Sequence, residues 1–196
     1  MPGKALLIID VQNDFSPGGS LAVPEADKII PYLNQYIKLF KKKKYPIFAS
    51  RDWHPRKSRH FKDFGGGWPI HCVQRTKGAR FHPQLKLPKK TIVLSKGMFS
   101  QEDSYSAMEA KNKKGETLKE LLKKLNIQEL YVGGLATDYC VKMTVLDLLK
   151  EDFKVNLLLD AIKGVNLKPN DSEKAIKLMQ NKGAILMNLE EVKEIL

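Results

Sequence analysis

The sequence has little cysteine and no long apolar run, and both shortages narrow the class of protein. Its two cysteines, Cys72 and Cys140, are too few for a disulfide scaffold or a cysteine-based zinc site. A single bridge between them stays open, but a reducing compartment suits the pair better. No apolar run approaches the ~20 residues of a membrane-spanning helix, and no secretory signal precedes the strand-like residues 5–9. We therefore expect a cytoplasmic protein with no membrane partner.

Acidic residues are also scarce beside basic ones. Aspartate and glutamate number 22 against 34 lysines and arginines, which gives a net charge of +12. Such a balance raises nucleic acid as a partner, yet the basic residues are scattered and no nucleic-acid-binding motif accompanies them. Their densest run, residues 41–44, falls where a predicted helix ends, a position at which the helix dipole favours cations. A solvated, lysine-rich surface therefore explains the charge better than a nucleic-acid groove.

Short apolar runs alternate with longer amphipathic ones along the chain. Strand-like runs occupy residues 5–9, 46–50, 91–94, 129–132, 155–159 and 184–187. Amphipathic segments predict helices at residues 25–40, 117–125, 139–150, 171–181 and 190–196. Strands separated by helices need crossover connections, so the pattern predicts a three-layer α/β/α fold with a mostly parallel central sheet. We expect one domain over residues 1–196, with a functional loop insertion around residues 51–90.

The stretch after the fourth predicted strand suits a nucleophile. It reads Gly133-Gly134-Leu135-Ala136-Thr137-Asp138-Tyr139-Cys140, and its two glycines allow a sharp backbone turn. Thr137 and Asp138 are good N-cap residues, which predicts that a helix starts beside them. Cys140 would then lie in the first helical turn, where free N–H groups and the helix dipole favour a thiolate over a thiol.

Three residues of complementary chemistry follow separate predicted strands: Asp10, Lys96 and Cys140. Ligands of open α/β sheets bind beyond the carboxyl ends of the strands, so we expect these side chains to converge there. A nearby ammonium lowers the pKa of a thiol, and a carboxylate can accept the proton that the thiol releases. Each residue alone has a structural explanation, as a turn cap, a surface ion pair or an inert buried thiol. The three together favour catalysis.

A second group of polar residues lies in the irregular loop. Five residues there are of metal-ligand type: Asp52, His54, His60, Asp63 and His71. The Asp-x-His pair sets two ligand types close together, and His71 follows three glycines that allow the loop to fold back. Oxygen and imidazole ligands suit Zn²⁺, Fe²⁺ or Mn²⁺. His82, between Phe81 and Pro83, is more typical of a structural histidine.

Five blocks of the sequence keep a common order and spacing between about residues 5 and 160. They are Ile9-Asp10-Val11-Gln12-Asn13-Asp14-Phe15, Asp52-Trp53-His54-Pro55, Trp68-Pro69-Ile70-His71-Cys72-Val73, Ser95-Lys96-Gly97 and Gly134-Leu135-Ala136-Thr137-Asp138-Tyr139-Cys140. Together they resemble the nicotinamidases, also called pyrazinamidases, of the isochorismatase-like cysteine hydrolases. The resemblance implies the isochorismatase-like hydrolase fold and, as the substrate, a small molecule rather than nucleic acid.

The activity that the resemblance implies is hydrolysis of nicotinamide to nicotinate and ammonia in NAD salvage, through a cysteine thioester, with pyrazinamide as a further substrate. The alternative within the superfamily is an amidohydrolase that acts on an N-carbamoyl or ureido compound. A rival of another class is a basic binding protein that kept the fold and lost catalysis. The resemblance leaves a monomer or a small homo-oligomer open.

The catalytic roles follow the same resemblance. Cys140 would be the nucleophile, Asp10 the general acid and base, and Lys96 the group that stabilises the thiolate. The bond between Leu135 and Ala136 matches a cis peptide of the family. The backbone N–H groups of Ala136 and Cys140 would form an oxyanion hole, a device worth a few kcal/mol (~2.7–4 per donor) in transition-state stabilisation.

The binding roles also come from the family. Asp52, His54 and His71 would hold one divalent metal ion, Zn²⁺ first and Fe²⁺ or Mn²⁺ as alternatives, with the pyridine nitrogen and waters as its other ligands. Substrate contacts would come from Phe15, Trp68, Leu135 and Ala136. The family pattern departs at Ser58 and His60, because its second histidine falls on Ser58. His60 becomes the candidate fourth ligand, with Asp63 as its rival, and residues 98–110 match no family block.

Overall fold

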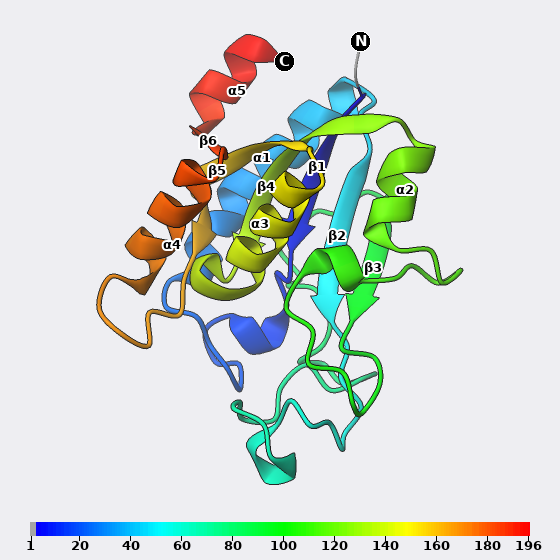
Figure 1. Ribbon diagram of the computed structural model, residues 1–196, viewed down its shortest axis with the longest axis vertical. Helices are drawn as coiled ribbons and strands as arrows, with labels where there is room; N and C mark the ends of the chain where they lie inside the picture. Colours follow the sequence, from blue (N-terminus) through cyan, green and yellow to red (C-terminus); the bar gives the residue numbers. More distant parts are fainter. Residues whose placement is uncertain (1–2) are drawn as a thin grey trace.

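The computed structural model describes residues 3–196, which form a single sheet covered by helices on both faces (Figure 1). The six strands lie in the order β3-β2-β1-β4-β5-β6, and every neighbouring pair is parallel. Their bounds are β1 Gly3–Ile9, β2 Ile47–Asp52, β3 Ile92–Lys96, β4 Ile127–Leu135, β5 Lys154–Lys163 and β6 Ile185–Met187. The predicted α/β class and parallel sheet are confirmed.

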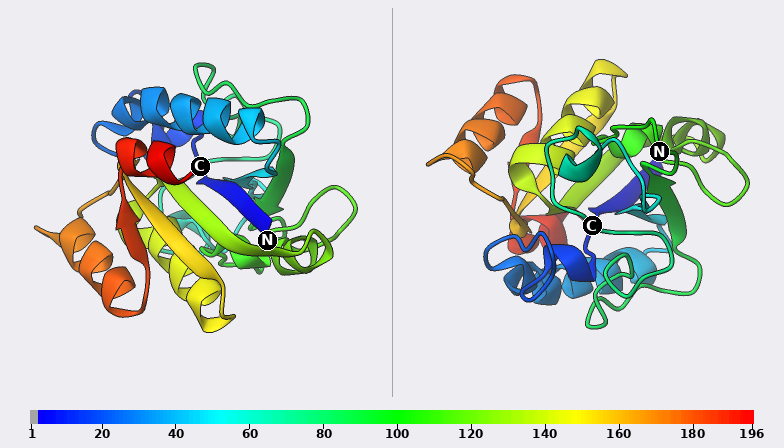
Figure 2. Two further views of the ribbon diagram at one scale, coloured as in Figure 1. Left: turned by 90° about the horizontal axis from the view of Figure 1, so that it is seen from above. Right: turned by 90° about the horizontal axis from the view of Figure 1, so that it is seen from below.

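The helices divide into two layers (Figure 2). Helices α2 and α3 pack on one face together with α4, whereas α1 and α5 cover the other face. Their bounds are α1 Ile30–Lys42, α2 Leu118–Lys124, α3 Lys142–Lys150, α4 Asp171–Asn181 and α5 Leu189–Ile195. No helix between residues 3 and 196 combines the length and the apolar character that a bilayer crossing requires.

Strand β1 shows why the sheet needs both layers. Its buried side chains alternate strictly, because successive residues of a strand point to opposite faces. Leu7 and Ile9 enter the core beneath α2, α3 and α4, and Leu6 and Ile8 enter the core beneath α1 and α5. Each face of this central strand is thus apolar, as expected for a parallel strand covered on both sides.

Two predicted boundaries were wrong for reasons that the backbone makes plain. The segment predicted as a helix over residues 25–40 begins with a 3₁₀ turn, Ala26–Ile29, and α1 itself runs from Ile30 to Lys42 with Pro31 in its first turn. The glycines predicted to form a turn instead extend β4, whose pairing with β1 sets Gly134 opposite Ile9. A Cβ on Gly134 would meet the Ile9 carbonyl oxygen at 2.1 Å, so close strand contact explains this glycine.

Candidate active site

The carboxyl ends of four adjacent strands deliver the residues singled out in the sequence. Asp10 follows β1, Asp52 ends β2, Lys96 ends β3, and Cys140 lies just beyond β4. Because these strands are neighbours in the sheet, the structure brings their terminal side chains into one buried cluster. One oxygen of Asp10, one oxygen of Asp52 and the sulfur of Cys140 lie within 4.8 Å of one another.

Lys96 is the centre of this cluster, and its side chain is fully buried. Its Nζ lies 2.9 Å from Asp10 Oδ2 and 3.5 Å from Cys140 Sγ, and it donates a hydrogen bond to Asp52 Oδ1. Burial alone would lower the pKa of this lysine, but the two carboxylates outweigh burial and raise its pKa well above the usual value. The cluster therefore contains a permanent ammonium ion.

Burial acts in the same direction on the two titratable groups beside Lys96, Asp10 and Cys140. Burial raises the pKa of Asp10, and the Lys96 charge offsets only part of that rise. Burial also raises the pKa of the Cys140 thiol well above its usual value, again against the effect of Lys96. Position alone was expected to favour a thiolate, but desolvation of the buried sulfur shifts its pKa in the opposite direction and outweighs Lys96.

The backbone around Cys140 differs from the predicted helix start. Residues Thr137–Val141 form a π-helical turn, and α3 begins only at Lys142. Neither Thr137 nor Asp138 caps a helix with its side chain. The carboxylate of Asp138 instead accepts hydrogen bonds from the backbone N–H groups of Val165 and Asn166, at 2.9 and 2.7 Å, in the loop after β5. The predicted capping role was wrong because this loop offers better donors.

The peptide bond between Leu135 and Ala136 is cis. It connects the end of β4 to the turn that carries Cys140, and the Ala136 carbonyl accepts hydrogen bonds from Tyr139 N and Val141 N, at 3.0 and 3.1 Å. Leu135, Ala136 and Cys140 all line the same pocket. The three residues named from the sequence in this stretch therefore face one cavity.

Three buried histidines form a second cluster next to the first. Ring nitrogens of His54, His60 and His71 lie within 4.8 Å of one another. The second oxygen of Asp52, Oδ2, lies 3.7 Å from His54 Nε2 and 3.8 Å from His71 Nε2. Burial opposes ionisation of Asp52, but Lys96 and the two histidines outweigh it and hold the pKa of Asp52 well below its usual value. A carboxylate and three imidazoles thus converge.

The hydrogen bonds of the histidines leave ring nitrogens turned toward each other. His71 Nδ1 donates to the Pro69 carbonyl at 2.7 Å, so its Nε2 carries a free lone pair. Burial, with the neighbouring His54, lowers the pKa of His60 to about 4, which keeps this ring neutral. Within residues 3–196, both nitrogens of the buried His54 have no hydrogen-bond partner. Buried imidazole nitrogens that lack hydrogen-bond partners and lie beside a carboxylate suit a divalent cation, because coordination to the cation would satisfy them.

Other polar residues of the loop over residues 51–90 do not belong to this histidine cluster. Asp63 is on an exposed 3₁₀ turn, Lys62–Phe64, and takes no part in the ligand cluster. Ser58 is buried, and its hydroxyl accepts a hydrogen bond from the His60 backbone N–H at 3.2 Å. His82 Nδ1 accepts from the Gln84 backbone N–H at 3.3 Å, which agrees with a structural histidine. The structure thus groups His60, rather than Asp63, with His54 and His71.

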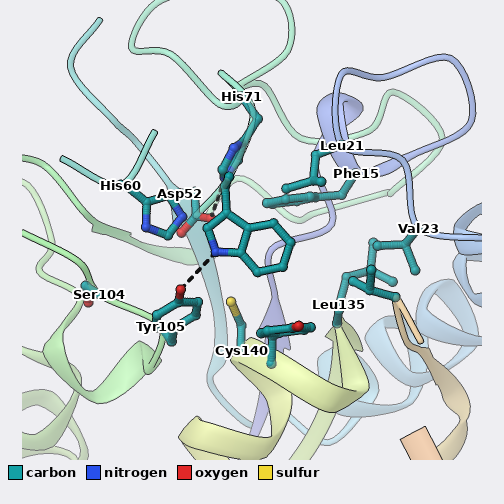
Figure 3. A pocket seen from close by; sticks show the side chains of 14 residues that line it. Phe15, Leu21, Val23, Asp52, His60, His71, Ser104, Tyr105, Leu135 and Cys140 are labelled. Atoms are coloured by element: carbon teal, nitrogen blue, oxygen red, sulfur yellow. Dashed lines mark hydrogen bonds and ion pairs between the residues drawn. The ribbon is translucent and has the colours of Figure 1, made fainter. Parts of the chain in front are cut away.

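A pocket of about 420 Å³, its open mouth included, lies over both clusters. Figure 3 shows the sulfur of Cys140 directed into the pocket, with His60 and His71 on the opposite side. All four substrate-contact residues predicted from the sequence line the pocket. So do six that the sequence did not reveal: Leu21, Val23, Ser104, Tyr105, Tyr139 and Val165. Its size is that of a small-molecule site, and its walls are mainly apolar and aromatic.

Tyr105 is the most informative of the missed residues. It comes from residues 98–110, which match no block of the family pattern, and its hydroxyl accepts a hydrogen bond from Trp68 Nε1 at 2.8 Å. The indole of Trp68 also meets the ring of Tyr139 edge-on, with centroids 4.8 Å apart. No motif marks Tyr105, because the aromatic residue nearer to the end of β3, Phe99, is the exposed one.

Comparisons with known proteins agree with this architecture. A family model described as the isochorismatase domain matches residues 4–191. A nicotinamidase of Escherichia coli (strain K12) is 40% identical over 210 residues, which cover 99% of this chain and 99% of that one. The crystal structure of the pyrazinamidase of Pyrococcus horikoshii in complex with zinc has a TM-score of 0.87 at 43% identity, covering 96% of this chain and 100% of that chain. The crystal structure of PnC1 from L. infantum in complex with nicotinate has a TM-score of 0.84 at 32% identity, covering 95% of this chain and 93% of that chain.

Proposed function

The chain belongs to the isochorismatase family, and from that premise we propose that it is a nicotinamidase, an amidohydrolase that converts nicotinamide to nicotinate and ammonia in NAD salvage. One observation carries the proposal above the rest. The buried ammonium of Lys96 lies against Asp10, Asp52 and Cys140 at once, which joins a nucleophile, a proton acceptor and a candidate metal ligand. In this proposal residues 1–196 act as one domain, and the loop of residues 51–90 supplies the histidines.

The reaction begins with proton transfer from the Cys140 thiol to the Asp10 carboxylate. The resulting thiolate attacks the carboxamide carbon of the substrate, while Lys96 balances the negative charge on sulfur. The backbone N–H groups of Ala136 and Cys140 stabilise the tetrahedral oxyanion. Asp10 then returns its proton to the leaving nitrogen, ammonia departs, and a thioester remains on Cys140.

Hydrolysis of the thioester uses the same carboxylate. Asp10 accepts a proton from water, the hydroxide attacks the thioester carbonyl, and the proton passes to the departing sulfur. Nicotinic acid forms and loses its proton to solvent to give nicotinate, and the thiol is restored. Burial suits this sequence, because it raises the pKa of both Asp10 and Cys140 and so lets one proton move between them.

The aromatic lining of the pocket suits a substrate that contains an aromatic ring. Phe15 and Trp68 line it from separate loops, and Tyr105 and Tyr139 add further aromatic surface. An N-carbamoyl or ureido group is not aromatic and would leave these aromatic walls without a ring to contact. The geometry therefore favours a pyridine carboxamide, and pyrazinamide as a second substrate of the same shape.

A divalent cation completes the proposal, with Asp52, His54, His60 and His71 as the residues that would hold it. Zn²⁺ is the cation we propose, since three imidazoles and one carboxylate match its ligand preference, and Fe²⁺ and Mn²⁺ are the alternatives. When bound, the cation supplies a Lewis-acid contact for the pyridine nitrogen. The protein's part is to place the ligand cluster across the pocket from Cys140.

The test is ammonia release from nicotinamide by the purified protein, with its metal content measured on the same sample. We expect Cys140→Ala and Asp10→Asn each to abolish release while circular dichroism and unfolding temperature show an intact fold. Cys72→Ala is the matched control, because it removes the other buried thiol and should retain most of the activity. Ammonia release at the wild-type rate in either active-site variant would refute the mechanism.

A further inference from the structure

Residues 99–105, which we term the strap, run beside residues 59–68 and are hydrogen-bonded to them at several points. The strap lies between β3 and α2 in the chain (Figure 1), and two of its residues, Ser104 and Tyr105, line the pocket. Four hydrogen bonds join it to residues 59–68: Arg59 N to Ser100 O at 2.9 Å, Arg59 Nη1 to Gln101 Oε1 at 3.0 Å, His60 Nδ1 to Asp103 Oδ1, and Trp68 Nε1 to the Tyr105 hydroxyl at 2.8 Å.

The bond between Asp103 and His60 differs from the other three because it reaches a candidate metal ligand. The His60 side chain is only 4% exposed, whereas that of Asp103 is 60% exposed. An exposed carboxylate therefore reaches the edge of a buried ring. The His60 ring stacks on His54 with centroids 4.5 Å apart, so its plane is restrained by a second contact as well.

The chemistry of imidazole decides what this contact does. A carboxylate can only accept, so His60 Nδ1 carries the proton and Nε2 keeps the lone pair that a cation needs. The negative charge also makes Nε2 a better electron donor, and such carboxylate–histidine pairs orient ligands in metal sites generally. His71 has its Nδ1 fixed by the Pro69 carbonyl, so two of the three rings are set by an outer partner.

We propose that Asp103 is a positioning residue that sets the tautomer and orientation of His60 for divalent-cation binding. Through the strap, the cation site is then linked to the pocket wall that Tyr105 forms. This inference rests on the proposed function in one respect, namely that His54, His60 and His71 hold a cation. It assigns a role to a stretch of chain that matches no block of the family pattern.

The competing explanation is that Asp103 merely fastens the strap. The two explanations differ in what they predict for cation affinity. Loss of a fastening contact would loosen the wall near Tyr105 and raise KM, but it would leave the cation affinity unchanged. Loss of a positioning carboxylate would weaken cation binding itself, with no substrate present.

The experiment measures Co²⁺ binding to the metal-stripped protein, by titration against a competing chelator and by the visible absorption spectrum of bound Co²⁺. We expect Asp103→Ala to weaken binding by about 10- to 100-fold, the usual cost of losing such a partner, and to alter the spectrum. Asp103→Asn should fall between, because its amide oxygen still accepts the bond but brings no charge. Gln101→Ala is the matched control, since it removes one hydrogen bond between the strap and the Arg59 side chain and leaves Asp103 in place.

Each outcome bears on one claim. Wild-type affinity and spectrum in Asp103→Ala would overturn the role of Asp103 and leave the cation site standing. An equal loss in Gln101→Ala would overturn it too, because fastening would then explain the effect. A wild-type protein that binds no Co²⁺ would overturn the cation site of the proposed function and this inference with it. The unfolding temperatures of the stripped proteins show whether each variant is folded.

Discussion

Replacing Lys96 by methionine tests the electrostatic core of the mechanism most directly. Methionine keeps much of the side-chain volume and removes the charge that lies 3.5 Å from Cys140 Sγ. At that separation a unit charge stabilises a thiolate by about 1 kcal/mol at a dielectric constant of 80 and about 5 kcal/mol at 20. These values correspond to roughly 1 to 3.5 pKa units. Since the ammonium lowers the thiol pKa, its removal should raise that pKa by an amount within this range.

The assay is alkylation of Cys140 by iodoacetamide over a range of pH. Thiolate is the reactive form, so the rate profile should move to higher pH in Lys96→Met. At a fixed pH below the thiol pKa, the alkylation rate should fall by about tenfold or more. Cys140→Ala measures the background from Cys72, and Lys119→Met, which removes an exposed lysine paired with Glu151, controls for general loss of positive charge.

Folding must be checked in the same samples, because Lys96→Met leaves Asp10 and Asp52 without their cation. Breaking a buried ion pair by removing one partner typically costs about 3–5 kcal/mol of stability. The double variant Asp10→Asn with Lys96→Met removes one of the stranded carboxylates and should recover part of that loss. An unchanged alkylation profile in folded Lys96→Met would refute the claim that this lysine stabilises the thiolate.

Two further predictions concern the candidate cation site. Removing metal with a chelator should raise KM for nicotinamide more than it lowers the unfolding temperature, because the ligand cluster borders the pocket; an unchanged KM in a verified metal-free enzyme would contradict the ligand role. Gly97→Ala should weaken Co²⁺ binding, since a Cβ there would meet His54 Cε1 at 2.4 Å and the residue has φ +62. Gly67→Ala, where a Cβ meets nothing within 4 Å, is the control, and equal affinities in the two variants would refute the reasoning.

The convergence of Asp10, Lys96 and Cys140 could be predicted because it depends on topology alone. Alternating strand and helix patterns imply parallel strands, and the carboxyl ends of parallel strands share one edge. The local geometry at Cys140 could not be predicted in the same way. Asp138 has an intrinsic preference for helix caps, but the loop after β5 offers it two backbone donors. Tertiary contacts of this kind leave no periodic signal in the sequence.

The contacts of the strap could not be predicted from the sequence for a similar reason. Asp103 and Tyr105 belong to no regular element, and their partners, His60 and Trp68, lie about forty residues earlier. His60 was difficult even as a ligand candidate, because the family pattern expects histidine at position 58, which is serine here. The sequence could not separate His60 from Asp63, because the two residues lie close together in the same loop. The fold buries His60 and exposes Asp63.

Asp52 connects the two halves of the site through its two carboxylate oxygens. Oδ1 accepts from Lys96 beside the nucleophile, and Oδ2 faces His54 and His71 at 3.7 and 3.8 Å. A buried carboxylate with only one of these partners would be costly, since a lone ion of either sign is poorly solvated in the interior. With both sets of partners present, the Asp52 carboxylate interacts with the Lys96 ammonium on one side and with the histidine rings on the other. The candidate nucleophile and the candidate cation site therefore share one ionised neighbour, and a change in the charge of Asp52 would act on both.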